Sequence, residues 1–305
     1  MITTWVGPGV APAQPARTPK ARSTAHVRFP ARAVAATWPA TGQGRDQIRQ
    51  RLTAAPFVMD TAGSQGKRVR GLTRLLDWLE SRPGTTWQER WLAGGTEAAG
   101  ERWADVPIGW LHEHGRRSVL LRAELANALR VLICADLIRP SLSWLVSNLA
   151  GRNSLARGLA RTRDPQGFAR LQERCDTDEA VSEAARKQAL RRASLILAAK
   201  GGGICDITVG DVLELLNVEA AAGLCAEHAA VFYRLLHEMG VFGAQAPARL
   251  RELRTPGQRS PEELIDRYRL VCLPVRDLLV DYLRERQPTV DYTTLKVLSH
   301  YLGIL

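Results

Sequence analysis

The sequence predicts an all-α protein with two helical bundle units behind a disordered basic N-terminal arm. Apolar residues recur at helical spacing, as in Leu72, Leu75 and Leu79. Strand signals are nearly absent, because the sequence has no sustained polar–apolar alternation and no Asn-Gly hairpin turn. The first 45 residues lack Asp and Glu and contain six prolines, which disfavour a stable helix. The predicted boundaries are 1–45 for the arm, 46–178 for the first unit and 179–305 for the second.

The basic charge is unevenly distributed. A net charge of +11 arises from 42 Lys and Arg against 31 Asp and Glu. Six of the positive charges lie in residues 1–45, so the rest of the chain carries only +5. A basic surplus favours polyanionic partners such as nucleic acid. The alternative explanation is the arginine-rich composition that accompanies GC-rich genomes.

The composition also argues against metal ions, cofactors and membranes as ligands or partners. The five cysteines lack the spacing of metal ligands, so we expect thiols in a reducing cytosol and neither a metal nor another cofactor. No apolar run approaches the roughly 18 residues needed to span a bilayer, and we expect no membrane partner. The acid-free arm also fits an organelle transit peptide, but its prolines favour a disordered arm or sequence read from a misplaced start.

The first helices follow from start and stop signals. A helix through residues 72–79 ends at Pro83-Gly84. Thr86, with Glu89 three residues later, forms a capping box that starts the next helix. The six tryptophans between residues 78 and 144 are expected in the core, and base stacking by one of them is the less favoured alternative.

The remainder of the first unit contains two apolar helices and a basic segment. Residues 119–149 are rich in Leu, Val, Ile and Ala, and Arg139-Pro140 predicts a corner between two helices. Residues 151–178 predict a helix, a turn at 164–167, a short helix and a linker at 176–178.

The second unit opens with a helix predicted over 180–200, which ends at the glycines 201–203. Thr208, with Asp211 at the third helical position, caps the next helix. The polar face of the first of these helices is predicted to hold Glu183, Lys187, Arg191 and Ser194.

The last segments of the second unit are also helical. Ser260-Pro261 supplies a cap and a proline suited to a first helical turn. The predicted segments are a helix over 225–239, a loop over 243–259, a helix over 264–282 kinked at Pro274, and a last helix over 291–303.

Nine stretches between residues 64 and 303 carry a family resemblance. They are 76–80 (LDWLE), 86–91 (TWQERW), 133–136 (ICAD), 139–142 (RPSL), 197–202 (LAAKGG), 206–211 (DITVGD), 232–238 (FYRLLHE), 260–268 (SPEELIDRY) and 275–282 (VRDLLVDY). In these stretches the chain resembles the N-terminal, core-binding-like part of actinobacterial tyrosine-recombinase-type site-specific integrases. The resemblance implies a DNA-binding portion that grips double-stranded DNA ahead of a catalytic domain. It also implies self-association on DNA and a bacterial cytoplasmic location, at the nucleoid when bound.

The catalytic residues of that family are not found in this sequence. Strand cleavage by a tyrosine recombinase needs a tyrosine nucleophile and a set of Arg and His residues that stabilises the developing charge. The stretch 114–117 (HGRR) matches His-x-x-Arg, but the next tyrosine, Tyr233, lies too far along the chain. We therefore expect the chain to stop before the catalytic domain and to have no strand-cleavage activity by itself. A truncated integrase and a regulatory DNA-binding remnant are both compatible with this expectation.

Binding to phosphates is the chemistry that remains, and Lys and Arg supply it. No small-molecule ligand is expected. The alternative is a helical protein–protein adaptor without a nucleic-acid role, in which these cations are only solvated helix faces. Clustering of the basic residues on one concave face would favour DNA, and dispersal would favour the adaptor. The candidate DNA-binding residues form three sets: Lys67, Arg68 and Arg70; Arg152, Arg157, Arg161 and Arg163; and Lys187, Arg191, Arg192 and Lys200.

Overall fold

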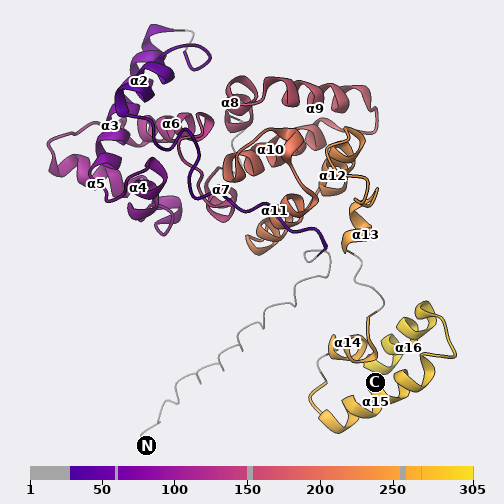
Figure 1. Ribbon diagram of the computed structural model, residues 1–305. Coiled ribbons are helices and arrows are strands. Elements are labelled where there is room, and N and C mark those ends of the chain that lie inside the picture. Colours follow the sequence, from indigo (N-terminus) through magenta and orange to yellow (C-terminus); the bar gives the residue numbers. More distant parts are fainter. Residues whose placement is uncertain (1–27, 59–60, 150–153, 255–258, 269, 305) are drawn as a thin grey trace, which may run out of the picture.

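The computed structural model describes residues 28–58, 61–149, 154–254, 259–268 and 270–304. These residues form α-helices and two single-turn 3₁₀ helices without any strand, which confirms the predicted all-α class (Figure 1). None of the helices described is long and apolar enough to cross a membrane. The α-helices are α2 (Arg45–Thr53), α3 (Ala62–Glu80), α4 (Trp87–Ala93), α5 (Asp105–Glu113), α6 (Leu121–Cys134), α7 (Leu142–Leu149), α8 (Ser154–Thr162), α9 (Pro165–Thr177), α10 (Glu183–Lys200), α11 (Val209–Ala221), α12 (Ala229–Glu238), α13 (Leu250–Arg254), α14 (Pro261–Asp266), α15 (Leu273–Arg286) and α16 (Tyr292–Ile304).

Side-chain caps form where the sequence predicts helix starts. The Thr86 hydroxyl accepts the N–H of Glu89 at 3.1 Å, and the Glu89 carboxylate accepts the N–H of Thr86 at 3.1 Å. Thr208 and Asp211 make the same reciprocal pair at the start of α11. Ser260 caps α14, with proline in its first turn. These caps satisfy N–H groups that have no acceptor within the helix.

Two helices begin elsewhere than predicted. α3 begins at Ala62, because the Thr61 side chain accepts the N–H of Ser64 at 3.3 Å, so residues 67–70 lie inside the helix rather than before it. The helix predicted over 264–282 is divided into α14 and α15, and Pro274 lies in the first turn of α15 rather than at a kink. A proline in this turn sacrifices no helical hydrogen bond.

One hydrophobic core extends from Ala40 to Leu253 and crosses the predicted boundary at 178/179. α10 packs against α7, α8, α9, α11 and α12. Its residues from Leu195 to Ala199 are all buried, and apolar surface on every side is typical of a central helix. The predicted division at 178/179 is therefore wrong, because α10 lies inside the core that the preceding helices share.

A second, smaller core belongs to α14, α15 and α16. It consists of Leu264, Ile265, Val280, Leu283 and Leu295. Figure 1 shows these three helices as a group apart from the others. The boundary between the two cores therefore lies after Leu253, far later in the chain than predicted.

Residues 28–45 do not form the free arm that their composition predicts. The Arg32 guanidinium lies 2.6 Å from the Asp211 carboxylate, and the Arg32 backbone N–H donates to the same group at 2.8 Å. Lys200 donates to the carbonyl oxygen of Arg32 at 2.8 Å. Because Asp211 is fully buried, it requires a counter-charge, which Arg32 supplies. Arg45 already begins α2, so the arm prediction is wrong for 28–45, and residues 1–27 lie outside the described residues.

Candidate nucleic-acid interface

The predicted polar face of α10 is partly buried. Arg192 is buried and its guanidinium lies 3.0 Å from the carboxylate of Glu219, which is also fully buried. Arg191 binds the same carboxylate, and the pKa of Arg191 is lowered mainly by burial. Ser194 is buried as well. The prediction that both arginines lie on a DNA-facing surface is therefore wrong, because their partner is a carboxylate of α11 inside the fold.

Arg163 and Lys200 are also held inside the main body. The Arg163 guanidinium lies 3.0 Å from Asp136 and donates to the carbonyl oxygen of Leu197 at 2.9 Å. Burial lowers the pKa of Arg163. Lys200 pairs with Glu214 at 2.8 Å. Both side chains are less than 10% exposed, so their predicted place on a DNA-binding surface is wrong as well.

Three other candidate cations lie on the surface. Lys187 lies 2.6 Å from Glu183, and Arg70 lies 3.2 Å from Glu124. The Lys187–Glu183 pair is exposed at both ends and is worth little in water, so a phosphate can compete for Lys187. Glu124, in contrast, is buried and also binds Arg74. Lys67 is exposed on α3 and forms no ion pair with a described residue. Arg152 lies outside the described residues.

The remaining candidates, Arg68, Arg157 and Arg161, converge on one cavity with Arg130. The cavity has a volume of 480 Å³ and is lined by residues of α3, α6 and α8. No carboxylate is among its described lining residues. We call these four residues the α8 arginine cluster. The other lining residues are Asn127, Val131, Ser154 and Gly158.

Neutral acceptors hold the α8 arginine cluster. Arg68 and Arg161 donate to backbone carbonyl oxygens of residues 57–58, and the Arg161 bond is 3.4 Å long. Arg130 Nη1 donates to the Ser154 hydroxyl at 2.6 Å. These hydrogen bonds end on neutral oxygen atoms, whereas the arginines around Glu219 bind a carboxylate.

Positive charge is concentrated in this cavity. The pKa of Arg68 is lowered first by burial and then by the positive charges of Arg161 and Arg130. Arg157 is exposed on α8 and forms no ion pair within the described ranges. Arg68, Arg157 and Arg161 therefore form no ion pair with a described residue, and the described residues of the cavity wall include no carboxylate.

Close helix contacts bring the cluster together. A Cβ atom on Gly71 of α3 would lie 2.4 Å from the carbonyl oxygen of Glu124 on α6. A Cβ atom on Gly158 of α8 would lie 2.6 Å from the Cys134 sulfur on α6. Glycine at both positions lets α3 and α8 approach α6 closely. Burial raises the pKa of Cys134 to about 11, so this residue packs as a neutral thiol.

Sequence reasoning missed Arg130 because it lies in an apolar helix away from the basic clusters. Asn127 and Arg130 interrupt the apolar stretch of α6 three residues apart, which places both on one face. This spacing was the available signal. It could not show that Arg68 of α3 and Arg157 of α8 face the same cavity.

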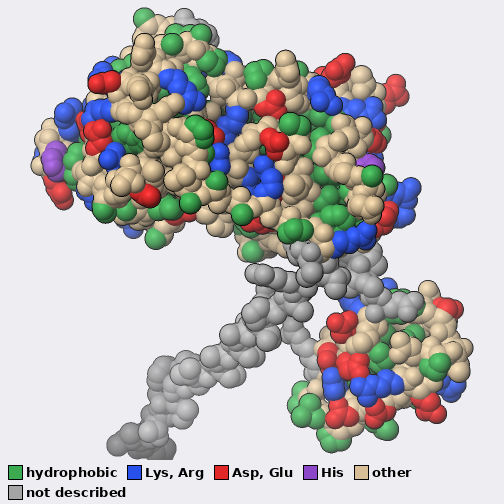
Figure 2. Space-filling model, in the orientation of Figure 1, with side chains coloured by type: hydrophobic (Ala, Val, Ile, Leu, Met, Phe, Trp, Pro, Cys, Tyr) green, Lys and Arg blue, Asp and Glu red, His purple; other side chains and the backbone are tan. Residues whose placement is uncertain are grey.

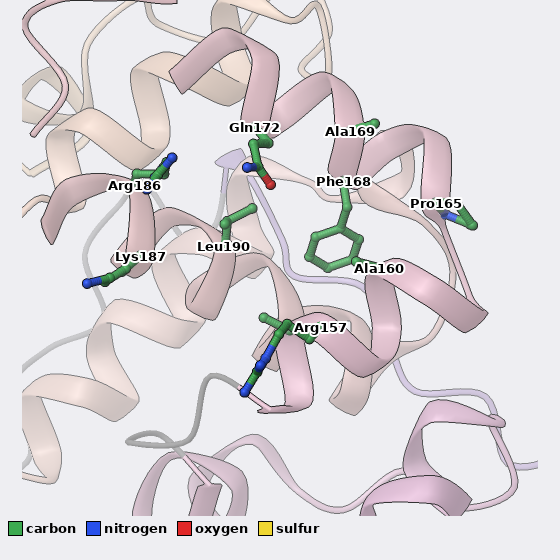
Figure 3. A pocket seen from close by; sticks show the side chains of 10 residues that line it. Arg157, Ala160, Pro165, Phe168, Ala169, Gln172, Arg186, Lys187 and Leu190 are labelled. Atoms are coloured by element: carbon green, nitrogen blue, oxygen red, sulfur yellow. The ribbon is translucent and has the colours of Figure 1, made fainter. Parts of the chain in front are cut away.

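A second, larger pocket of 630 Å³ lies beside the cluster (Figure 3). Phe168 and Leu190 form part of its wall, and Arg157, Arg186 and Lys187 also line it. In Figure 3, Lys187 and Arg157 extend away from the apolar side chains. Arg157 therefore borders both cavities, and Lys187 of the third basic set comes close to the α8 arginine cluster.

The partial match to a recombinase active site has no catalytic geometry. His114 ends α5 and its Nδ1 lies 2.8 Å from the carbonyl oxygen of Trp110. Tyr233 is fully buried and donates to the carbonyl oxygen of Pro247 at 2.8 Å, and burial raises its pKa to about 12. A different tyrosine, Tyr268, lies beside His300 and accepts a hydrogen bond from Arg267. In the described residues no group of His, Cys, Asp and Glu is arranged to hold a metal ion.

The clustering of basic residues is local. Figure 2 shows Lys and Arg side chains interspersed with Asp and Glu over the visible face. One member of the first predicted set and two of the second meet at the α8 arginine cluster, with Lys187 nearby. Comparisons of the chain with models of known protein families, with characterised proteins and with solved structures give no match.

Proposed function

We propose that this chain binds double-stranded DNA as the DNA-binding portion of a site-specific integrase. The observation that carries the proposal is the α8 arginine cluster, in which four arginines line a cavity whose described residues include no carboxylate. Arginine that is not neutralised by the protein can bind phosphate oxygens through charge-assisted hydrogen bonds. The sequence resemblance to integrases supplies the biological context of the proposal.

The spacing on α8 suits a phosphate backbone. Arg157 and Arg161 are four residues apart, which corresponds to about 6 Å along a helix axis. Successive phosphates of one DNA strand rise about 3.4 Å along the duplex axis and also turn about it, so neighbouring phosphates lie roughly 6–7 Å apart, a similar distance. α8 would therefore contact one strand, with Lys67 and Lys187 as flanking cations.

Salt-dependent binding tests the role of α8. We expect Arg157→Ala with Arg161→Ala to weaken binding to a duplex with 5′-hydroxyl ends. We also expect the slope of log K against log salt to fall by roughly two, because each lost phosphate contact removes about 0.9. Fluorescence anisotropy over a salt series measures both quantities. Stability should change by only about 0.5 kcal/mol, because both side chains are exposed.

A matched pair provides the control. Arg116 and Arg117 are exposed in the loop after α5, and Arg116→Ala with Arg117→Ala removes the same charge. This pair should leave the affinity nearly unchanged. Equal losses of DNA affinity for the two pairs would show that binding depends on the net charge of the protein and that α8 is not the interface.

We further propose that the chain does not cleave DNA by itself. A suicide duplex that traps covalent tyrosine–DNA adducts should yield none after denaturing electrophoresis. An adduct would contradict this proposal, and Tyr268→Phe would then identify or exclude the tyrosine beside Arg267 and His300. Tyr233 is unsuited to attack because its hydroxyl is buried and its pKa is raised.

A protein–protein adaptor is the second candidate, and one observation favours it. Large apolar side chains are exposed in the small C-terminal unit, including Val271, Leu273, Leu278, Tyr301 and Ile304. Such surfaces are typical of interaction sites. An adaptor would bind no duplex in the experiment above, and its partner affinity would not depend on Arg157.

A further inference from the structure

Arg68 is buried and forms no ion pair with any residue that the structure describes. It is 7% exposed, and its Nε is buried and lacks a hydrogen-bond acceptor in the described part of the chain. The other strongly buried arginines are paired: Arg192 with Glu219, and both Arg139 and Arg163 with Asp136. Burying an unpaired charge is unfavourable, so an anion from outside the protein would complete this site.

We propose that the cavity of the α8 arginine cluster is a binding site for a phosphate monoester. This inference names a ligand for the same cluster that the proposed function uses. It rests on the proposed function only in the roles of the surface residues Arg157 and Arg161. Arg68 and Arg130 form the inner part of the site. The expected ligand is a dianionic phosphate group that enters the cavity, rather than a diester that crosses its rim.

Charge distinguishes the two kinds of phosphate. A diester carries one negative charge, whereas a monoester carries about −1.5 to −2 at neutral pH and has three strong acceptor oxygens. Four guanidinium groups line the cavity, so the dianion is the better match. Arg68 Nε offers an N–H that no described protein atom accepts.

The remaining walls also suit a phosphate. Asn127 and Ser154 add neutral polar side chains, and Ser154 begins α8. The N-terminal end of a helix favours anions, because its first N–H groups are unpaired and its dipole is positive there. The volume of 480 Å³ falls within the roughly 300–1,000 Å³ of small-molecule sites, so it can also admit the group that carries the phosphate.

Two sources could supply this chemistry: a small phosphorylated molecule such as a nucleoside 5′-monophosphate, or the 5′-phosphate end of a DNA strand. Titration of the full chain with inorganic phosphate, followed by calorimetry and thermal unfolding, tests the site itself. Sodium chloride at matched ionic strength is the reference. We expect a saturable rise in melting temperature with phosphate that chloride does not reproduce.

Two variants keep the test decisive. Arg130→Gln should weaken phosphate binding by about tenfold or more, the effect of losing a hydrogen bond to a charged group. Arg157→Gln changes an exposed side chain and should weaken binding without disturbing the fold, whereas Arg117→Gln should change nothing. A phosphate response no larger than that of chloride, or an unchanged response in both cavity variants, would overturn the proposal.

Binding experiments with DNA duplexes distinguish the two phosphate sources, and they also distinguish this proposal from the proposed DNA-binding function. Tighter binding of a 5′-phosphorylated duplex than of its 5′-hydroxyl form, lost in Arg130→Gln, supports a DNA end as the ligand. Equal binding of both duplexes, together with saturable binding of a nucleoside monophosphate, supports a small molecule. Binding of inorganic phosphate without any duplex binding would retain this site and remove the proposed DNA function.

Discussion

Two groups of arginines in this chain have similar local sequences but different environments in the fold. Arg191 and Arg192 surround the fully buried carboxylate of Glu219 in the main core. Arg157 and Arg161 lie on the exposed side of α8, beside a cavity in which no described lining residue is a carboxylate. Both pairs belong to short basic stretches of helices, α10 and α8. The position of the acidic partner, rather than the density of basic residues, decides which group can bind a ligand.

The contrast explains why local charge is a weak guide to a binding site. A buried arginine must be paired, and its partner can lie far along the chain, as Glu219 does from Arg192. An arginine that remains without a carboxylate is available to an external anion. The first group should therefore determine stability, and the second should determine binding.

The largest expected effect is the loss of the buried counter-charge. Glu219→Gln should lower the free energy of unfolding by about 3–5 kcal/mol, because it removes the carboxylate that pairs with the buried Arg192. Urea unfolding followed by circular dichroism measures the change. Glu183→Gln, which breaks the exposed pair with Lys187, should change stability by no more than about 0.5 kcal/mol. Equal effects of the two substitutions would remove the distinction between buried and exposed groups.

The second effect concerns the contact that places α8. Gly158→Ala should destabilise the chain by about 1–3 kcal/mol, because the new Cβ would lie 2.6 Å from the Cys134 sulfur. It should also weaken DNA binding by displacing Arg157 and Arg161. The double variant with Cys134→Ala removes the obstructing sulfur and should recover part of both losses. Additive losses in the double variant would show that the sulfur contact is not the cause.

Much of the local structure could be predicted from the sequence. Capping boxes at Thr86 and Thr208 and the proline after Ser260 placed helix starts correctly, because these signals act within one helical turn. The all-α class followed from the same local periodicity. Signals of this kind are independent of what packs against the helix.

Arrangements that depend on distant residues could not be predicted in this way. The boundary at 178/179 was wrong because α10 packs among helices on both sides of it. The arm was wrong over 28–45 because composition cannot show that Asp211 receives Arg32. Arg130 was missed because its neighbours Arg68 and Arg157 come from other helices.

A smaller effect is expected when one buried arginine from each group is replaced by methionine. Arg68→Met should alter the free energy of unfolding by no more than about 1 kcal/mol, because removal of an uncompensated buried charge offsets the lost hydrogen bond to Phe57. Arg192→Met should cost about 3–5 kcal/mol, because it breaks a buried pair with Glu219. The same urea titration ranks the two variants. Equal costs would indicate that Arg68 already has an anionic partner in the folded chain.

The smallest effect lies outside both groups, in a surface pair of the C-terminal unit. The Ser260 hydrogen bond, then a backbone bond and Arg284, lower the pKa of Glu262 from 4.5 to about 2. A carboxylate with a lowered pKa stabilises the folded state above its unfolded value, so this contribution should be lost as pH falls from about 4.5 to about 2. Because the pair is partly exposed, its contribution should stay below about 1 kcal/mol.

Hydrogen exchange in residues 261–304 measures this contribution. The Glu262→Gln variant should be less protected than wild type at pH 7 and equally protected near pH 2. The control Glu285→Gln changes an exposed residue of α15 and should match wild type throughout, so a similar loss there would assign the effect to net charge rather than to the pair.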